Sequence, residues 1–138
     1  MSVSSGSAPA GRRVATVAVV VADYDEAIAW YTHKLGFELL EDVALGEGKR
    51  WVVVAPGNGG ARLLLAQAAD AEQRSRIGNQ TGGRVFLFLE TDDFARDHAL
   101  MIERSVEFRE APRREAYGTV AVFADLHGNL WDLIEPRG

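Results

Sequence analysis

The sequence predicts an α+β protein built from two tandem βαβββ modules, and two stretches carry this prediction. Residues 14–42 have the pattern of an apolar strand, an acidic helix cap, an amphipathic helix, a glycine stop and a second strand. Residues 84–110 repeat that order about 70 residues later. A repeated pattern outweighs a single motif, because each copy must bury the same kind of face.

The first module is expected over residues 13–66. Residues 14–21 are apolar and β-branched, as in a buried strand. Asp23 stands at the N-cap of the helix that follows. Gly36 is expected in the left-handed conformation that stops this helix. The remaining strands of the module are expected at residues 37–45, 49–55 and 61–66, separated by glycine-rich turns.

The second module is expected over residues 84–138, after a polar linker at residues 67–83. The linker has room for one helical turn, and a loop of this length joins modules or covers a site. A helix is expected at residues 93–104, with Ser105 in the stop position that glycine holds in the first module. The strands of this module are expected at residues 84–90, 106–110, 117–124 and 130–135, with a turn at residues 111–114.

Composition limits the classes of partner. The chain has 47% hydrophobic and 25% charged residues, a formal charge of −5 and no cysteine. Nucleic acid is not an expected partner, because it would require a basic stripe. Without cysteine, neither disulfides nor thiolate metal sites can form. Residues 1–12 are expected to be a flexible tail without a signal core, and no apolar run reaches the roughly 20 residues of a membrane span. We therefore expect a cytoplasmic protein without a membrane partner.

Two stretches are more specific than the general pattern: VVVADYDEAIAWYTHKLGFEL near the start and YGTVAVFADLHGNLWDLIEP at the end. Together with the two modules they resemble the vicinal oxygen chelate superfamily, over residues 13–136. That group includes glyoxalase I, extradiol dioxygenases, and fosfomycin- and bleomycin-resistance proteins. The resemblance implies a glyoxalase/bleomycin-resistance/dioxygenase fold, in which mixed sheets curl around a cavity, and it implies a homodimer. One scaffold in this superfamily carries several chemistries, so the fold does not fix the function.

Metal-using members of this superfamily place ligands on the first and last strand of each module. By the resemblance, these positions fall on Thr16, Phe86, Asp132 and Leu64, with Leu63 as the alternative to the last. Only Asp132 is an ordinary ligand, whereas zinc, nickel or iron sites need three or more nitrogen, sulfur or carboxylate ligands. The three histidines are expected in surface or packing roles. We therefore expect no metal cofactor, with a divalent metal as the alternative.

The same positions are candidates for binding an organic ligand. Phe86 and Trp51 are expected to line an apolar pocket suited to a flat or oxygenated molecule. Arg84 lies two residues before Phe86, so alternation puts both side chains on one sheet face. We predict that Arg84 approaches Asp132, directly or through water. The alternative is that Arg84 points to solvent and Asp132 bonds to Thr16 or to backbone amides.

Three functions remain open from the sequence. The favoured one is binding of a small organic molecule without the usual metal, with candidate ligand-binding residues Thr16, Trp51, Leu64, Arg84, Phe86 and Asp132. The second is a metal-dependent lyase, transferase or dioxygenase. The third is an enzyme without a metal that uses Arg84 and Asp132 as electrostatic and acid–base groups. No residue is assigned a catalytic role.

Overall fold

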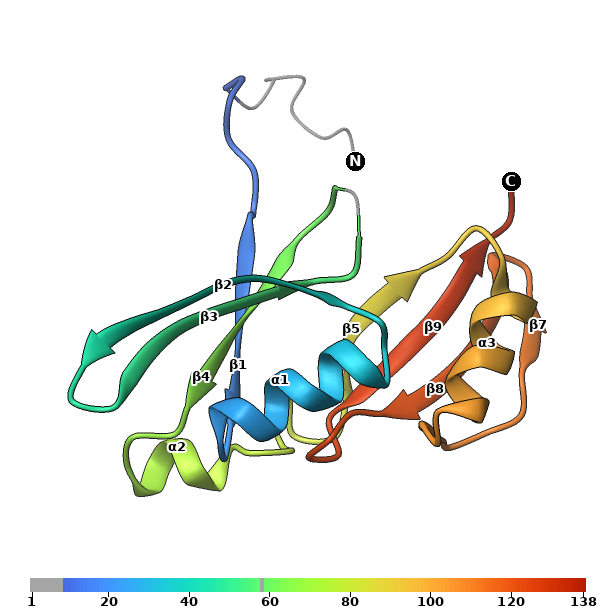
Figure 1. Ribbon diagram of the computed structural model, residues 1–138. Helices are drawn as coiled ribbons and strands as arrows, with labels where there is room; N and C mark the ends of the chain where they lie inside the picture. Colours follow the sequence, from blue (N-terminus) through green and yellow to red (C-terminus); the bar gives the residue numbers. More distant parts are fainter. Residues whose placement is uncertain (1–8, 58) are drawn as a thin grey trace.

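The computed structural model describes residues 9–57 and 59–138, so most of the expected tail lies outside the described residues. Two modules lie side by side, each with a sheet and one long helix (Figure 1). The first module contains β1 (Thr16–Val21), α1 (Tyr24–His33), β2 (Glu38–Gly46), β3 (Lys49–Ala55) and β4 (Arg62–Gln67). After α2 (Ala71–Ser75), the second contains β5 (Val85–Glu90), α3 (Phe94–Glu103), β6 (Glu107–Phe108), β7 (Arg113–Glu115), β8 (Gly118–Ala124) and β9 (Leu130–Pro136). Within the described ranges, no helix is long and apolar enough to cross a membrane.

The two sheets share one topology, which confirms the predicted repeat. The first sheet has the strand order β1-β4-β3-β2, with β1 and β4 parallel and the other pairs antiparallel. The second has the order β5-β9-β8-β6, again with a parallel first pair, and β7 also pairs with β8. The expected strand at residues 106–110 is shorter than predicted. Part of the expected turn at residues 111–114 is instead β7, which follows Pro112, a residue that has no N–H to donate to a ladder.

Both long helices begin and end as the sequence predicts. The side chain of Asp23 accepts a backbone hydrogen bond at 2.8 Å, and that of Asp93 does the same at 3.0 Å. Gly36 has a φ of 72° and Ser105 a φ of 65°, so both stops are left-handed. A left-handed serine is uncommon. The second module therefore keeps the geometry of the glycine stop with a less suitable residue.

One hydrophobic core lies between the helices and one face of each sheet. Tyr31 of α1 and Met101 of α3 are both buried in it. The strand side chains of the core alternate along the chain, as expected for sheets packed on one side: they include Val19, Val21, Val52, Val54, Leu63, Leu65, Ala121, Phe123, Trp131 and Leu133. Trp131 therefore points away from the face that carries Asp132.

The opposite side of each sheet is here called its open face. Alternation and strand pairing assign the side chains on it. The open face of the first sheet carries Thr16, Ala18, Glu41, Val43, Trp51, Val53, Arg62 and Leu64. The open face of the second sheet carries Phe88, Glu90, Arg113, Val120, Val122, Asp132 and Ile134.

Hydrogen bonds join the two modules. The Tyr31 hydroxyl on α1 donates to Asp125 Oδ2 at 2.7 Å, in the turn between β8 and β9. In the same turn, His127 Nε2 accepts a bond from the backbone N–H of Ala22 at 3.2 Å. His127 thus has a packing role, as expected. The turn that ends the second module is therefore anchored on the first.

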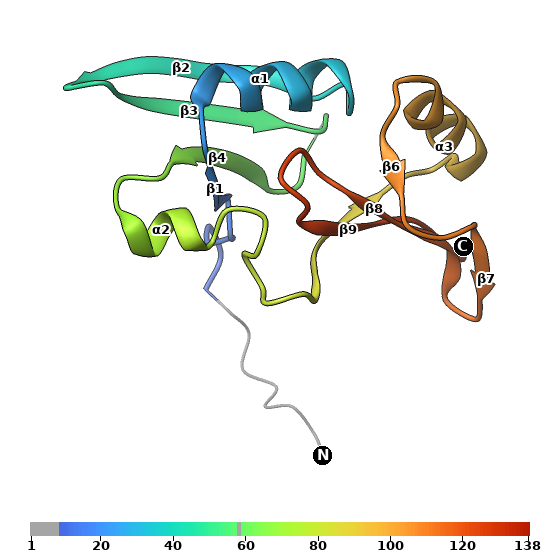
Figure 2. The same ribbon diagram turned by 90° about the horizontal axis from the view of Figure 1, so that it is seen from below.

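The linker covers the outer edge of β1. The Gln80 amide donates to the carbonyl of Ala18 at 3.1 Å and accepts from the N–H of Val20 at 3.2 Å. The expected helical turn of the linker is α2, capped by Asp70. Figure 2 shows α2 beside β1 and β4, and the β2–β3 hairpin projecting beyond α1. The linker thus both joins the modules and satisfies backbone groups of an edge strand.

Candidate functional site

Three of the expected ligand-binding residues share the open face of the first sheet. Leu64 pairs with Ala18 on one side and with Val53 on the other. Thr16 and Trp51 each lie two residues from one of these partners, so they face the same way. Trp51 is 40% exposed, while Thr16 and Leu64 are half-buried. The expected grouping of these three residues is therefore present.

Asp132 lies on the open face of the second sheet, in register with Phe88 of β5. Phe88 is 63% exposed, whereas Asp132 is only 8% exposed. Among the described residues, Asp132 Oδ1 has no hydrogen-bond partner. Burial raises the pKa of this carboxyl, Arg113 lowers it and Glu110 raises it. A buried oxygen without a donor carries a desolvation cost, so a ligand donor at this point would be stabilised.

Phe86 does not lie on the open face with the other expected ligand-binding residues. The pairing of β5 with β9 shifts between Val85 and Leu87, which places Phe86 in a β-bulge. Its ring packs edge-to-face on Trp131, with centroids 6.4 Å apart, and it joins the core. The bulge interrupts the alternation on which the expectation rested. Phe88 therefore takes the place on the open face that was assigned to Phe86.

The sequence predicts that Arg84 approaches Asp132 directly or through water, and the direct form of this prediction is wrong. Arg84 is exposed, just before β5, and no hydrogen bond or ion pair links the two side chains. The cation that acts on Asp132 is Arg113 of β7. Arg113 is itself bonded to Glu110 at 3.0 Å and to Glu115 at 2.5 Å. The β-bulge accounts for the error, because it breaks the register by which Arg84 was placed.

Besides Arg113, two residues of the open faces are not among the candidates that the sequence predicts. Arg62 begins β4 and pairs with Thr16. The alternation that relates Arg62 to Leu64, two residues later, would have found it. Phe88 pairs with Asp132, but the bulge that brings it there leaves no clear mark in the sequence. Both residues extend the expected site.

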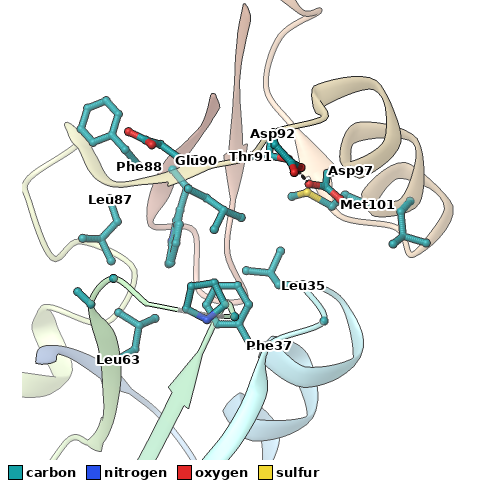
Figure 3. A pocket seen from close by; sticks show the side chains of 18 of the residues that line it. Leu35, Phe37, Leu63, Leu87, Phe88, Glu90, Thr91, Asp92, Asp97 and Met101 are labelled. Atoms are coloured by element: carbon teal, nitrogen blue, oxygen red, sulfur yellow. Dashed lines mark hydrogen bonds between the residues drawn. The ribbon is translucent and has the colours of Figure 1, made fainter. Parts of the chain in front are cut away.

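A separate cleft of about 1040 Å³ opens on the helix side of the sheets, between the modules. Figure 3 shows Leu87 pointing into it toward Leu63, and Phe88 and Glu90 of β5 contribute to its edge. Its apolar wall includes Phe37 and Met101. None of the six expected ligand-binding residues lines this cleft, although Leu63, the alternative to Leu64, does.

Four polar side chains at the rim of the cleft bond to one another: Thr91, Asp92, Arg96 and Asp97. Arg96 is bonded to Asp97 at 3.0 Å and to Asp92 at 3.1 Å, and Thr91 donates to Asp97. The Arg96 and Thr91 bonds hold the pKa of Asp97 below its usual value. By contrast, the buried side-chain atoms that lack a partner, within the described part of the chain, are Arg62 Nε and Asp132 Oδ1. The buried polar atoms without a partner in the described residues thus lie on the open faces.

The positions that would hold a metal do not form a ligand set. Leu64 pairs with Ala18, which stands five residues before the helix cap Asp23. Asp132 pairs with Phe88, which stands five residues before the helix cap Asp93. Leu64 is therefore the counterpart of Asp132, as expected. In residues 9–57 and 59–138, no group of three His, Cys, Asp or Glu side chains is placed to hold a metal ion. One carboxylate does not supply the three or more ligands that a zinc, nickel or iron site needs.

Comparisons with known proteins agree with this architecture. The model of the Glyoxalase/Bleomycin resistance protein/Dioxygenase superfamily matches residues 13–133. An uncharacterised protein of Shewanella frigidimarina (strain NCIMB 400) is 57% identical over 121 residues, covering 86% of this chain and 90% of the relative. The crystal structure of UcmS2 is 30% identical with a TM-score of 0.78, covering 89% of this chain and 97% of that one. TnmS3, an antibiotic-binding protein from Streptomyces sp. CB03234, is 30% identical with a TM-score of 0.75, covering 94% and 100%.

Proposed function

Because the chain belongs to the Glyoxalase/Bleomycin resistance protein/Dioxygenase superfamily, we propose that it binds a small organic molecule on the open faces of its sheets, without a divalent metal. The observation that carries this proposal is the pair formed by Phe88 and Asp132. An exposed aromatic ring lies in register with a buried carboxyl oxygen that has no donor among the described residues. The ring offers stacking area and the oxygen fixes the orientation of a polar group, which are the two components of a ligand site.

The structural neighbour TnmS3 supports the same class of function, since it is an antibiotic-binding protein with the same fold. Trp51 on the first sheet adds a second exposed aromatic surface. The donor set at Thr16, Leu64 and Asp132 disfavours a metal-dependent lyase, transferase or dioxygenase. The exposed position of Arg84 removes the acid–base pair on which an enzyme without a metal was expected to rest.

A homodimer is part of the proposal. Strands β1 and β5 each have one partner strand among the described residues, so the outer edge of each strand has no further strand paired to it. On β1, Gln80 bonds to part of this edge. Natural proteins cover such edges. Apolar side chains on the β2–β3 hairpin are also exposed, and they include Leu39, Leu40, Val43 and Leu45. A second copy that covers these surfaces would also enclose the open faces.

Thermal unfolding against a panel of aromatic and polycyclic compounds tests the proposal. A compound that binds at 100 times its dissociation constant adds about 2.7 kcal/mol to the free energy of unfolding. Phe88→Ala and Asp132→Asn are the test variants, and Leu100→Ala is the control. Phe88 and Leu100 are both exposed and both line the cleft, whereas Asp132 does not line it. The experiment is run with and without a chelator.

We expect a stabilising compound whose effect is lost in Phe88→Ala, weakened in Asp132→Asn, kept in Leu100→Ala and unchanged by chelation. Loss of the effect in Leu100→Ala, with or without its loss in Phe88→Ala, would place the ligand in the cleft and contradict the site. Loss on chelation would contradict binding without a metal. A panel that stabilises neither the parent nor the control would contradict the proposed function for these classes of compound.

A further inference from the structure

We propose that the ligand of the open faces is an aromatic acid, whose anionic oxygen binds the guanidinium of Arg62. This inference rests on the proposed function and adds the chemical class of the ligand. It depends on the first sheet, whereas the proposed function depends chiefly on Phe88 and Asp132 of the second.

Arg62 stands at the start of β4, where its Cα pairs with Thr16 of β1. It lies two residues before Leu64, so its side chain shares the open face with Leu64 and Thr16. Arg62 is half-buried, with 37% of its side chain exposed. The head group is therefore held within the sheet surface while part of it remains accessible.

The hydrogen-bonding capacity of Arg62 is not used within the described residues. Its Nε is buried and has no acceptor in residues 9–57 and 59–138. Its closest carboxylate is Glu41, with 4.0 Å between Arg62 Nη1 and Glu41 Oε2, beyond hydrogen-bond distance. By comparison, Arg50 reaches Asp42 at 2.8 Å. A guanidinium carries five donors in a fixed fork, so a ligand oxyanion can take the donors that Glu41 does not reach.

The surroundings of Arg62 favour an aromatic ligand. Leu64, Val53 and Trp51 extend from it across the same face, and Trp51 is 40% exposed. An indole of this kind offers a stacking surface for a planar ring. Glu41 lies on this face as the pairing partner of Val53, and its charge competes with a ligand anion. A planar ring that carries a carboxylate or phenolate matches both the apolar surface and the cation.

The corresponding cation of the second sheet is not available in this way. Arg113 is bonded to both Glu110 and Glu115, at 3.0 Å and 2.5 Å. The carboxyl of Asp132 lies nearby on the same face. An anion would meet three acidic groups there. The first sheet is therefore the place for the acidic end of the ligand.

Isothermal titration with 1-hydroxy-2-naphthoate and with its neutral amide tests this inference. Arg62→Met removes the charge while keeping an unbranched side chain, and Arg62→Lys keeps the charge without the planar fork. Arg76→Met is the matched control, because Arg76 is exposed at the end of α2 and pairs with Glu72 at 3.5 Å. Glu41→Gln removes the competing carboxylate.

We expect the acid to bind the parent protein about tenfold or more tightly than the amide, the factor that a charge-assisted hydrogen bond supplies. Arg62→Met should abolish that preference without changing the affinity for the amide, and Arg62→Lys should keep part of it. Glu41→Gln should increase the affinity for the acid, and Arg76→Met should change nothing.

Equal affinity for acid and amide would overturn the assignment of an acid while leaving the proposed function intact. An equal loss of both in Arg62→Met would also overturn it, because the role of Arg62 would then be structural. If neither the acid nor the amide binds, but the thermal-unfolding panel yields another ligand, the inference is overturned. If the panel also yields none, the proposed function fails with it.

Discussion

The hydroxyl of Tyr31 on the first helix donates a 2.7 Å hydrogen bond to Asp125 in the last turn of the second module. Asp125 also accepts from the backbone N–H of Asn129 at 2.9 Å and from Trp131 Nε1 at 3.3 Å. Burial and the charge of Asp125 raise the pKa of Tyr31 well above its usual value, so the phenol stays protonated and donates. This bond joins the two modules inside the core.

Replacing Tyr31 with phenylalanine tests this connection. The ring remains to pack against Phe37 and Trp131, and Asp125 keeps its other donors. We expect Tyr31→Phe to lower the free energy of unfolding by about 1–2 kcal/mol, as for loss of a buried hydrogen bond to a charged acceptor. Urea unfolding measures it. A change below about 0.3 kcal/mol would contradict a role of this bond in stability.

Asp132→Asn tests the burial of the open-face carboxyl. The pKa of Asp132 is raised in the folded protein, so folding favours its protonated form. The free energy of unfolding therefore falls as the pH rises from 3.8, the ordinary pKa of the carboxyl, through its raised pKa in the folded protein. It stays lower at higher pH. Asparagine cannot ionise, so the variant should be more stable than the parent near pH 7 and not near pH 3. Asp92→Asn, with a side chain that is 89% exposed, is the control. Destabilisation of Asp132→Asn at pH 7 would contradict an unpaired Asp132.

Ser105→Gly tests the equivalence of the two helix stops. Ser105 has a φ of 65°. This left-handed conformation is roughly 1 kcal/mol less favourable for a residue with a Cβ than for glycine. We expect Ser105→Gly to raise the free energy of unfolding by up to about 1 kcal/mol, and Gly36→Ser to lower it. Thermal and urea unfolding report both changes. A destabilised Ser105→Gly variant would show that the serine side chain contributes something that this comparison omits.

The homodimer is tested by light scattering at micromolar concentration. We expect twice the mass of the chain and a buried area of roughly 1,200 Å² or more in total. Val43→Lys is the matched variant, since Val43 is 49% exposed on the β2–β3 hairpin. It should weaken association without unfolding the protein. A parent protein that is monomeric under these conditions would contradict the dimer.

The fold was more predictable than the site, for reasons that particular residues show. Asp23, Gly36 and their counterparts Asp93 and Ser105 mark the helix ends through local chemistry, which the sequence carries directly. Leu64 and Thr16 were placed correctly on one face because β1 and β4 are regular.

The errors arose where strand geometry is irregular. The bulge at Phe86 moves its ring into the core and brings Phe88 opposite Asp132. A bulge depends on pairing with a strand more than 40 residues away, so local alternation cannot predict it. The same irregularity explains why the sequence predicts that Arg84 reaches Asp132. Arg113 is the cation that neighbours Asp132, and it lies on β7, where the sequence predicts a turn.

Fluorine NMR of protein labelled with 5-fluorotryptophan tests the central claim most directly. The chain has three tryptophans, of which Trp51 lies on the open face of the first sheet and Trp131 lines the cleft. The probe is the panel compound that gives the largest thermal shift. Binding on the open faces, with the ring of the ligand on Trp51, predicts a saturable shift of the Trp51 resonance, with Trp131 little changed. A shift of Trp131 that is lost in Leu100→Ala, with Trp51 unchanged, would contradict the account and place the ligand in the cleft between the modules.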